Sequence, residues 1–495
     1  MNRLKLSAGE DREKDHLQNF RKIVRDLLLL LRTSLQVETV SMHWVNNNRK
    51  IFVLASYATI CKNVRFQDRV KRELHLLGKF STIKSITRLE KNVHFKSGDL
   101  THYSSSPPIN HIYLIPFVVN AETVAITTVE ASEKPEWTAV DEQTASACQK
   151  VLGRMLKSYQ EVSELVEKQT EWLEYDHMIR NLAKAEDPLE LASVLVDKLQ
   201  HFAGRDGGTV LLARGLNEWH TVMNSAGSKY PPPIGLELQK GSIAAQALSD
   251  GEPFFSPHFN ANPKRISPSE PLCYGTSLAV PVMHRQRRQL LAVVYSENPL
   301  LFNEVTKHKI SNLCRITGLK LEAMLPGLDV YDNIFSTTTN SYSKELISVI
   351  LSRLSGHDRI ETPGLSTWVG MIAIGNINDM RTRYRLDDLT DLKRQILCKI
   401  RPQNFGIPGI IGTYSDYIYI FLLQSSDESA CLSWSGHLKD AFREPMSFSS
   451  NKHEKVQLNI GVMRLSGEMA PDFVLEKIKK AMNDAVKQNK FIAEV

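Results

Sequence analysis

The chain has 495 residues, of which 42% are hydrophobic and 23% are charged, with a formal net charge of +6 at pH 7. This composition is typical of a globular protein of roughly three domains and does not predict nucleic-acid binding, which needs a concentrated basic face. The longest aliphatic run, Leu27 to Leu31, is far shorter than the roughly 20 residues of a membrane-spanning helix. No apolar segment typical of a signal peptide opens the chain, so we expect a cytoplasmic protein without a transmembrane segment.

The six cysteines lie far apart in the sequence, and no two of them form a Cys-x-x-Cys pair. This spacing does not predict a zinc site or a disulfide framework, and it favours free thiols in a reducing compartment. We therefore expect neither a metal ion nor another cofactor.

The first elements predicted along the chain are a helix and two strands. Apolar residues at helical spacing predict a helix over residues 15–35. Strands are predicted over residues 39–44 and 50–57, on either side of a turn of three asparagines.

Two later segments, residues 111–143 and 275–309, follow the same pattern. Each has a strand that ends in a proline, a short polar turn, a second apolar strand, a Ser-Glu-x-Pro loop, an aromatic residue and then a long helix. The proline and the aromatic residue before the helix are 21 residues apart in both segments, as Pro116 and Trp137 and as Pro281 and Phe302. An offset of about 165 residues between similar segments predicts a duplicated domain.

A helix of about 40 residues is predicted between the two copies, ending near residue 182. Its apolar stripe must be buried somewhere. Packing on its own two domains is one alternative, and a parallel stalk between two copies of the chain is the other, which we favour. The stripe follows a seven-residue repeat through Cys148, Val151, Met155, Val162, Leu165 and Trp172.

The last third of the chain alternates β-rich runs with helical patterns. Strands are predicted over residues 368–374 and 456–463, with a hairpin over residues 410–423 whose turn falls near Ser415 and Asp416. Helices are predicted over residues 386–400 and 472–488.

These patterns resemble two known families. The duplicated segments resemble GAF domains, and the order of elements in the last third resembles a GGDEF (diguanylate cyclase) domain. The resemblance implies an α/β (α+β) fold class, with two antiparallel GAF-like sheets followed by a mixed α/β domain. It also implies the domain bounds, which are 1–145 for the first GAF-like domain, 146–185 for the linker helix, 186–324 for the second GAF-like domain and 325–495 for the GGDEF-like domain.

The GGDEF resemblance covers the order of helices and strands but not the metal-binding residues of the family. Joining two GTP molecules needs divalent metal ions, and the family holds these ions with carboxylates. The family's two metal-binding aspartates align with Ala373 and Gly375. Its signature hairpin aligns with SDYIY, in which the only acid, Asp416, stands one or two positions early. The resemblance thus implies no catalytic residue, and leaves as vestigial positions Ala373, Gly375, Ser415, Asp416, Tyr417, Ile418 and Tyr419.

The resemblance also gives positions for the family's product-binding site and for its GTP phosphate contacts. The Arg-x-x-Asp motif that binds the inhibitory product aligns with Gly406 and Gly409, so we expect no binding of cyclic di-GMP there. Arg381 and Lys487 are the candidates for phosphate contacts in the GTP site. The alternative is that the arginines near residue 381 are solvent-exposed residues in the segment that precedes a helix.

These observations favour a non-catalytic, bacterial-type signalling or scaffold protein of cyclic di-GMP signalling, a pseudoenzyme that binds protein partners through its degenerate GGDEF-like domain. Its GAF-like domains would serve homodimerisation or the sensing of a small-molecule ligand in a GAF pocket. One alternative is a sensor that binds GTP or a cyclic dinucleotide without turnover. The other is an active diguanylate cyclase that uses acids outside the family pattern, such as Asp379 and Asp416.

Overall fold

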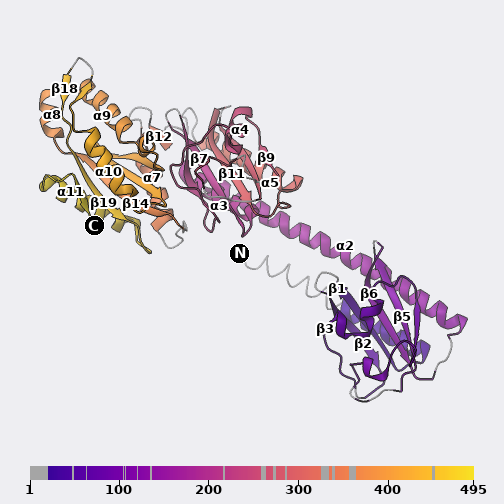
Figure 1. Ribbon diagram of the computed structural model, residues 1–495. Helices are drawn as coiled ribbons and strands as arrows, with labels where there is room; N and C mark the ends of the chain where they lie inside the picture. Colours follow the sequence, from indigo (N-terminus) through magenta and orange to yellow (C-terminus); the bar gives the residue numbers. More distant parts are fainter. Residues whose placement is uncertain are drawn as a thin grey trace. The chain divides into compact units, whose positions relative to one another are not determined.

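The computed structural model describes residues 20–46, 50–62, 64–103, 105, 108–119, 121–133, 137–215, 218–257, 264–270, 275–284, 287–324, 334–336, 341–355, 364–448 and 452–495 (Figure 1). The chain divides into two compact units, Met1–Glu174 and Tyr175–Val495. Within the described part of the chain, none of the helices has the length and apolarity that crossing a membrane requires. Mixed helices and largely antiparallel sheets confirm the expected fold class.

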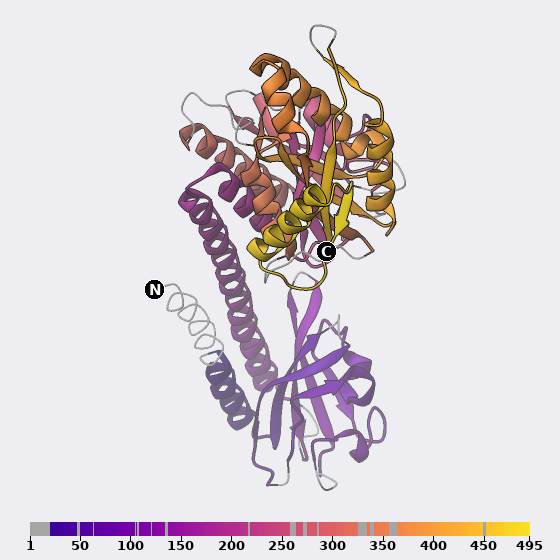
Figure 2. The same cartoon turned by 90° about the vertical axis from the view of Figure 1, so that its left-hand side faces the viewer.

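The first unit is built on a six-stranded antiparallel sheet in the order β3-β2-β1-β6-β5-β4. The helix of residues 20–35 and the first part of α2 pack on one face of this sheet, as expected from their apolar stripes (Figure 2). The strands are β1 (Thr39–Asn46), β2 (Ile51–Thr59), β3 (Arg69–Lys71), β4 (Thr87–Glu90), β5 (His111–Val119) and β6 (Glu122–Ala131). Short 3₁₀ helices follow β3 and β4, namely η1 (Arg72–Leu74), η2 (Leu76–Phe80) and η3 (Ser97–Asp99).

Helix α2 (Ala139–Lys184) is 46 residues long and belongs to both units. Ala145 and Leu152 of its first part are fully buried in the core of the first unit. Tyr175 and Leu182 of its last part belong to the core of the second unit. The helix predicted between the two copies is thus confirmed, and its two ends are anchored in different cores.

The second unit begins with a five-stranded sheet in the order β8-β7-β11-β10-β9. Asp187 caps the helix that precedes this sheet, accepting a 2.9 Å hydrogen bond from the backbone N–H of Leu189, and Pro188 occupies the first helical position. The elements are α3 (Pro188–Ala203), β7 (Gly207–Arg214), β8 (Trp219–Asn224), α4 (Ile243–Asp250), β9 (Phe254–Ser256), β10 (Thr276–His284), β11 (Arg287–Ser296) and α5 (Glu304–Met324). Helices α3 and α5 pack on one face of the sheet, and α4 packs on the other.

The two sheets repeat one topology, as the sequence predicts. The order β2-β1-β6-β5-β4 corresponds strand by strand to β8-β7-β11-β10-β9. The starts of β5 and β10 (111 and 276), of β6 and β11 (122 and 287) and of α2 and α5 (139 and 304) are each 165 residues apart. Even the β-bulges correspond, after Phe117 in the first sheet and after Val282 in the second.

The last part of the chain forms a seven-stranded sheet in the order β12-β13-β15-β16-β14-β19-β20. The strands are β12 (Phe335–Ser336), β13 (Ser341–Tyr342), β14 (Ser366–Ile374), β15 (Gly409–Ser415), β16 (Ile418–Ser425), β19 (Leu458–Arg464) and β20 (Ile492–Glu494), with a separate hairpin of β17 (Met446–Phe448) and β18 (Lys452–Glu454). The helices are α7 (Lys344–Ser355), α8 (Ile377–Arg383), α9 (Leu386–Ile400), η4 (Pro402–Phe405), α10 (Ala430–Ala441) and α11 (Pro471–Lys487).

Each face of the seven-stranded sheet has its own core. Helices α7 and α11 cover the face of Met371 and Leu422, and helices α9 and α10 cover the face of Ile372 and Phe421. The predicted strands, the hairpin and the helices over 386–400 and 472–488 are confirmed. The separate hairpin, β20 and the helices α7 and α10 were not predicted.

The second GAF-like sheet and the C-terminal sheet share one hydrophobic cluster, which runs from α3 and β7 to α7 and β14. Polar contacts cross between them as well. Arg353 of α7 lies 2.5 Å from the Asp197 carboxylate of α3, and the Gln424 side-chain oxygen accepts a 2.7 Å bond from the Ile234 backbone N–H. His220 Nδ1 of β8 lies 2.8 Å from the hydroxyl of Tyr342 on β13. The C-terminal sheet is therefore packed as a continuation of the second GAF-like domain.

Candidate functional site

The hairpin turn between β15 (Gly409–Ser415) and β16 (Ile418–Ser425) contains the residues that the sequence alignment places at the GGDEF signature. Ser415 pairs with Ile418, so Asp416 and Tyr417 form the turn itself. Tyr417 has a φ of +65°, a left-handed conformation that is uncommon for a residue other than glycine. Its ring is nonetheless buried, at 5% exposure, so packing of the ring holds the turn in shape.

Basic side chains from the two preceding helices surround the Asp416 carboxylate. Lys393 Nζ of α9 lies 2.9 Å from Oδ1, and the Arg381 guanidinium of α8 lies 4.0 Å from Oδ2. The Lys393 hydrogen bond and charge, together with Arg381, hold the pKa of Asp416 below its ordinary value. Both cations also lie over the Tyr417 ring, with Lys393 Nζ 3.9 Å and Arg381 Cζ 4.8 Å from its centroid.

The aligned positions, Ala373 at the end of β14 and Gly375 just after it, carry no acid. Ala373 is buried and pairs with Ile418 of the hairpin and with Asn459 of β19. A Cβ at Gly375 would collide with Oδ1 of Asn459, so a larger side chain at Gly375 would force Asn459 to move. The two positions that the alignment assigns to metal-binding aspartates thus carry an alanine and a glycine, both next to Asn459 of β19.

The rest of the aligned signature lies in or near the core. Ile418 is half-buried, and Tyr419 is 1% exposed on the face covered by α9 and α10. Burial raises the pKa of the Tyr419 hydroxyl well above its ordinary value. In the part of the chain that the structure describes, Asp416 belongs to no group of three side chains close enough to hold one cation.

The structure places the two candidate phosphate contacts differently. Arg381 is engaged with Tyr417 and Asp416, as described above. Lys487 is exposed at the C-terminal end of α11. Arg383, on the same helix as Arg381, lies 3.1 Å from the Glu454 carboxylate, which also accepts a 2.7 Å hydrogen bond from Tyr384. The arginines near residue 381 thus contact neighbouring side chains within the domain.

In the first GAF-like sheet, a polar cluster fills the face opposite the helices. Glu130 of β6 is 1% exposed and accepts hydrogen bonds from the Tyr103 hydroxyl at 2.7 Å and from His102 Nε2 at 3.1 Å. The rings of His43 and His75 are 5.0 Å apart. Burial and the neighbouring histidines lower the pKa of His43 to about 3 and that of His75 to about 4.

The cavity within this histidine–glutamate cluster has a volume of only about 10 Å³. A ligand there would have to displace side chains. The sequence analysis missed this cluster. The signal that could have found it is the pair Ser41 and His43, two buried polar residues on one face of an otherwise apolar strand.

The corresponding face of the second GAF-like sheet is closed by apolar packing under α4. Its charged residues are a pair, Arg265 and Glu270, whose side chains are both 0% exposed and 3.2 Å apart. The Arg265 guanidinium lies 4.1 Å from the centroid of the Tyr295 ring on β11. This interior is therefore filled by its own side chains.

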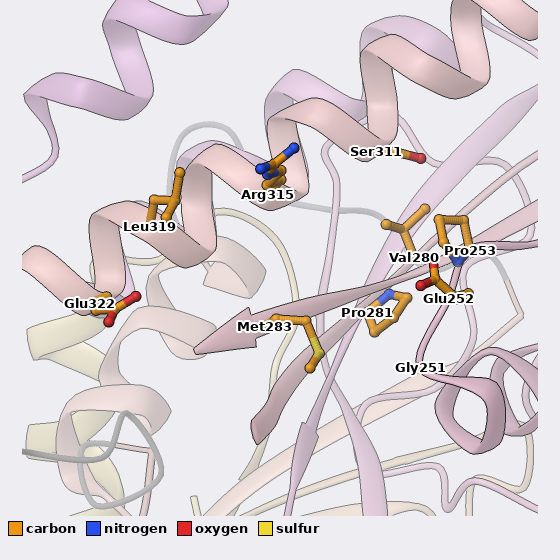
Figure 3. Close-up of a pocket in the computed structure, with 10 residues that line it drawn as sticks. All are labelled: Gly251, Glu252, Pro253, Val280, Pro281, Met283, Ser311, Arg315, Leu319 and Glu322. Atoms are coloured by element: carbon orange, nitrogen blue, oxygen red, sulfur yellow. The ribbon is translucent and has the colours of Figure 1, made fainter. Parts of the chain in front are cut away.

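An open groove of about 770 Å³ lies on the outside of the second GAF-like domain, between α5 and β10 (Figure 3). Arg315, Leu319 and Glu322 line it from the helix, and Pro281 and Met283 line it from the strand. The groove follows β10 past Ala279, where the pairing with β9 ends. Pro281 lacks the N–H that an added strand would need, which protects this edge of the sheet.

The predicted stalk residues of α2 fall into two groups. Cys148 and Met155 pack against the core of the first unit, which is the alternative of burial on the chain's own domain. Val151, Leu165 and Trp172 are exposed, at 46%, 64% and 61%. The side chain of Val162 lies outside the described residues.

No family model matches the chain, and no curated protein matches it. Solved structures do. The GGDEF domain of FimX from Pseudomonas aeruginosa is 15% identical, with a TM-score of 0.28, over 32% of this chain and 97% of that one. The GAF domain of the Acinetobacter phosphoenolpyruvate-protein phosphotransferase is 14% identical, with a TM-score of 0.28, over 32% of this chain and 98% of that one.

The chain is similar in fold to GAF and GGDEF domains. Diguanylate cyclase SiaD of Pseudomonas aeruginosa, solved in complex with its activator SiaC, is 14% identical with a TM-score of 0.29. The match covers 38% of this chain and 72% of that one. At these identities and TM-scores the matches carry no argument about chemistry, which has to come from the side chains of this chain.

Proposed function

We propose that this protein is a non-catalytic member of a cyclic di-GMP signalling system, whose GGDEF-like domain binds a protein partner instead of converting GTP. This proposal rests on the side chains at the hairpin turn between β15 and β16. Its one carboxylate, Asp416, is held by Lys393 and Arg381. The positions that would supply further carboxylates are Ala373 and Gly375.

The charges around the hairpin turn do not favour a divalent cation. Joining two nucleoside triphosphates needs divalent cations that neutralise the phosphates and activate a hydroxyl group, and such cations need several oxygen ligands. A divalent cation at this turn would meet one carboxylate and two positive side chains. It would have to displace Lys393 from its 2.9 Å contact before it could bind.

The alternative of a nucleotide sensor without turnover has less support. A triphosphate without its metal ion would need free cations to bind. Arg381 and Lys393 already contact Asp416, and Arg383 contacts Glu454. A phosphate would therefore have to compete with carboxylates of the same domain.

Dimerisation through α2 belongs to the same proposal. Val151, Leu165, Trp172 and Leu173 expose apolar surface on a single long helix. Pairing with the same stripe of a second copy would bury these residues, as in a parallel coiled coil.

The test of the enzymatic question is incubation of the full chain with GTP and Mg²⁺, followed by chromatography of the products. We expect no cyclic dinucleotide from the wild type and none from Lys393→Ala, which releases Asp416 without adding the missing carboxylates. Product from the wild type would rule out the proposal. Product from Lys393→Ala alone would identify Asp416 as a latent metal ligand.

Calorimetry of the full chain with GTP and with cyclic di-GMP separates the remaining two functions. Binding of either nucleotide, lost in Arg381→Ala, would favour the sensor over the partner-binding protein. For the dimer, analytical ultracentrifugation should show that Leu165→Glu and Trp172→Glu each weaken self-association by roughly tenfold or more. Lys157→Glu changes an exposed residue at heptad position c, away from the apolar seam of the same helix, and serves as the control.

A further inference from the structure

Three potential metal ligands meet at the start of β8, far along the chain from the hairpin turn. One ligand atom each from Glu218, His220 and Glu237 lies within 4.8 Å of the others. Glu218 directly precedes β8, whose second residue is His220, and a Glu218 carboxylate oxygen lies 4.0 Å from His220 Nε2. His220 pairs with Glu237 in an antiparallel bridge, which adds the third side chain to the group.

The His220 ring is the feature that distinguishes this cluster from ordinary surface acids. The residue is 6% exposed, and its Nδ1 lies 2.8 Å from the Tyr342 hydroxyl. Its Nε2 is buried without a hydrogen-bond partner among the described residues, and it lies 4.0 Å from a Glu218 carboxylate oxygen. A buried imidazole nitrogen with no partner destabilises the fold, and a ligand bound there would remove this cost.

We propose that Glu218, His220 and Glu237 bind a first-row divalent cation, with zinc as the cation to test first. One imidazole and two carboxylates are a ligand set that zinc accepts, with a remaining position for water, whereas Mg²⁺ prefers oxygen ligands alone. Glu218 is 44% exposed, so water has access to the site.

The geometry needs a side-chain adjustment. Zinc bonds to nitrogen and oxygen are about 2.0–2.2 Å long, so two ligands of one tetrahedral ion are roughly 3.4 Å apart. The His220 Nε2 to Glu218 distance of 4.0 Å therefore has to shorten by roughly 0.6 Å. The three ligand atoms, which lie within 4.8 Å of one another, have to close by up to roughly 1.4 Å, which rotation of the partly exposed glutamate side chains allows.

Cation binding at this site would act on the contact between the second GAF-like sheet and the C-terminal sheet. Metal at Nε2 requires that the proton of the neutral ring be on Nδ1, where it donates to the Tyr342 hydroxyl on β13. The cation would thus fix one tautomer, in which Nδ1–H donates to the Tyr342 hydroxyl instead of accepting from it. The positive charge of Arg401 acts on His220 and opposes a cation there, whereas the Glu218 and Glu237 carboxylates attract one. This site does not depend on the proposed loss of catalysis.

The experiment is calorimetry of the metal-free full chain with ZnCl₂, with MgCl₂ in parallel, together with thermal unfolding in each metal. We expect zinc binding and a zinc-dependent rise in unfolding temperature, and neither effect with Mg²⁺. Glu218→Gln and Glu237→Gln should each weaken zinc binding by roughly tenfold or more. Glu252→Gln, which changes an exposed glutamate of the same domain, should bind zinc like the wild type.

Tyr342→Phe tests the coupling to the C-terminal sheet. It leaves all three ligands in place and removes the hydroxyl that fixes the ring, so we expect weaker zinc binding, by about 10–100-fold. His220→Gln should abolish the zinc effect, and Glu218→Gln covers the case in which His220→Gln fails to fold. Zinc binding that persists unchanged in the Glu218→Gln, Glu237→Gln double variant, or that is absent from the wild type, would overturn the proposal.

Discussion

The two GAF-like sheets have the same strand order and register but different interiors. On the face opposite the long helices, the first sheet carries polar side chains at positions where the second carries apolar or aromatic ones. The corresponding pairs are Ser41 and Val210, His43 and Leu212, Thr128 and Val293, and Glu130 and Tyr295. The GAF-like backbone therefore does not by itself specify a ligand pocket.

The difference assigns separate roles to the two copies. The first retains a hydrogen-bonded cluster around Glu130, which is the kind of interior that a polar ligand could enter by exchanging hydrogen bonds. The second is closed by α4 and by the Arg265–Glu270 pair, and its other face is continuous with the C-terminal core. If either copy senses a small molecule, we expect it to be the first.

The largest effect should come from breaking the buried pair of the second copy. Arg265→Met leaves the Glu270 carboxylate buried without its partner, which should cost about 3–5 kcal/mol of unfolding free energy. Hydrogen exchange of the full chain, read at β7, β11 and α4, would measure this cost. Arg464→Met, which removes a half-exposed ion pair with Glu428, should cost less than about 1 kcal/mol.

The double variant Arg265→Met, Glu270→Leu sharpens this result. Removing both charges should recover most of the lost stability, because neither a charge nor its desolvation cost is left in the core. If Arg265→Met alone costs no more than Arg464→Met, the second interior is more accessible to water than its packing indicates.

Acidification should affect the first copy more strongly than the second. The pKa values of His43 (about 3) and His75 (about 4) lie below the ordinary 6.5. At a pH between the lowered values and 6.5, the unfolded state therefore binds more protons than the folded state. The stability that the neutral rings contribute is present above pH 6.5 and is lost as the pH falls, by about 1.4 kcal/mol per ring at pH 5.5.

Hydrogen exchange at pH 7 and 5.5 would compare the two copies in one sample. In the second unit, burial and the charge of Arg401 lower the pKa of His220 to about 4. With one such ring instead of two, the second unit should lose about half as much stability as the first. His75→Gln should flatten the pH dependence of the first unit only. An equal loss in both units would contradict the contrast between the two interiors.

The smallest effect should come from single hydrogen bonds in the two interiors. Glu130→Gln keeps the size of the side chain but weakens its bonds to Tyr103 and His102, and we expect a loss of about 1–2 kcal/mol from the first unit. Tyr295→Phe, at the corresponding position of the second unit, removes the hydroxyl that donates a 3.3 Å bond to the Tyr230 carbonyl. It should cost less than about 1 kcal/mol by the same thermal or exchange measurement.

Much of the fold could be predicted from the sequence, because burial and repeat spacing leave local patterns. The hairpin around Ser415, the helix that begins at Leu386 and the 165-residue offset between β5 (111) and β10 (276) are all visible as runs of residue types. The absence of acids at residues 373 and 375 is visible in the same way. Short strands such as β17 and β20 were missed because three residues leave no period to detect.

What the sequence determined by itself is the order of the elements and the residue types at each aligned position. Only the tertiary structure decided which distant side chains meet. It brought Lys393 to Asp416 across the hairpin, His102 to Glu130 inside the first sheet, and His220 to Tyr342 across two sheets. Periodicity reports which face of one element is buried, whereas contacts between elements depend on how the sheets and helices pack.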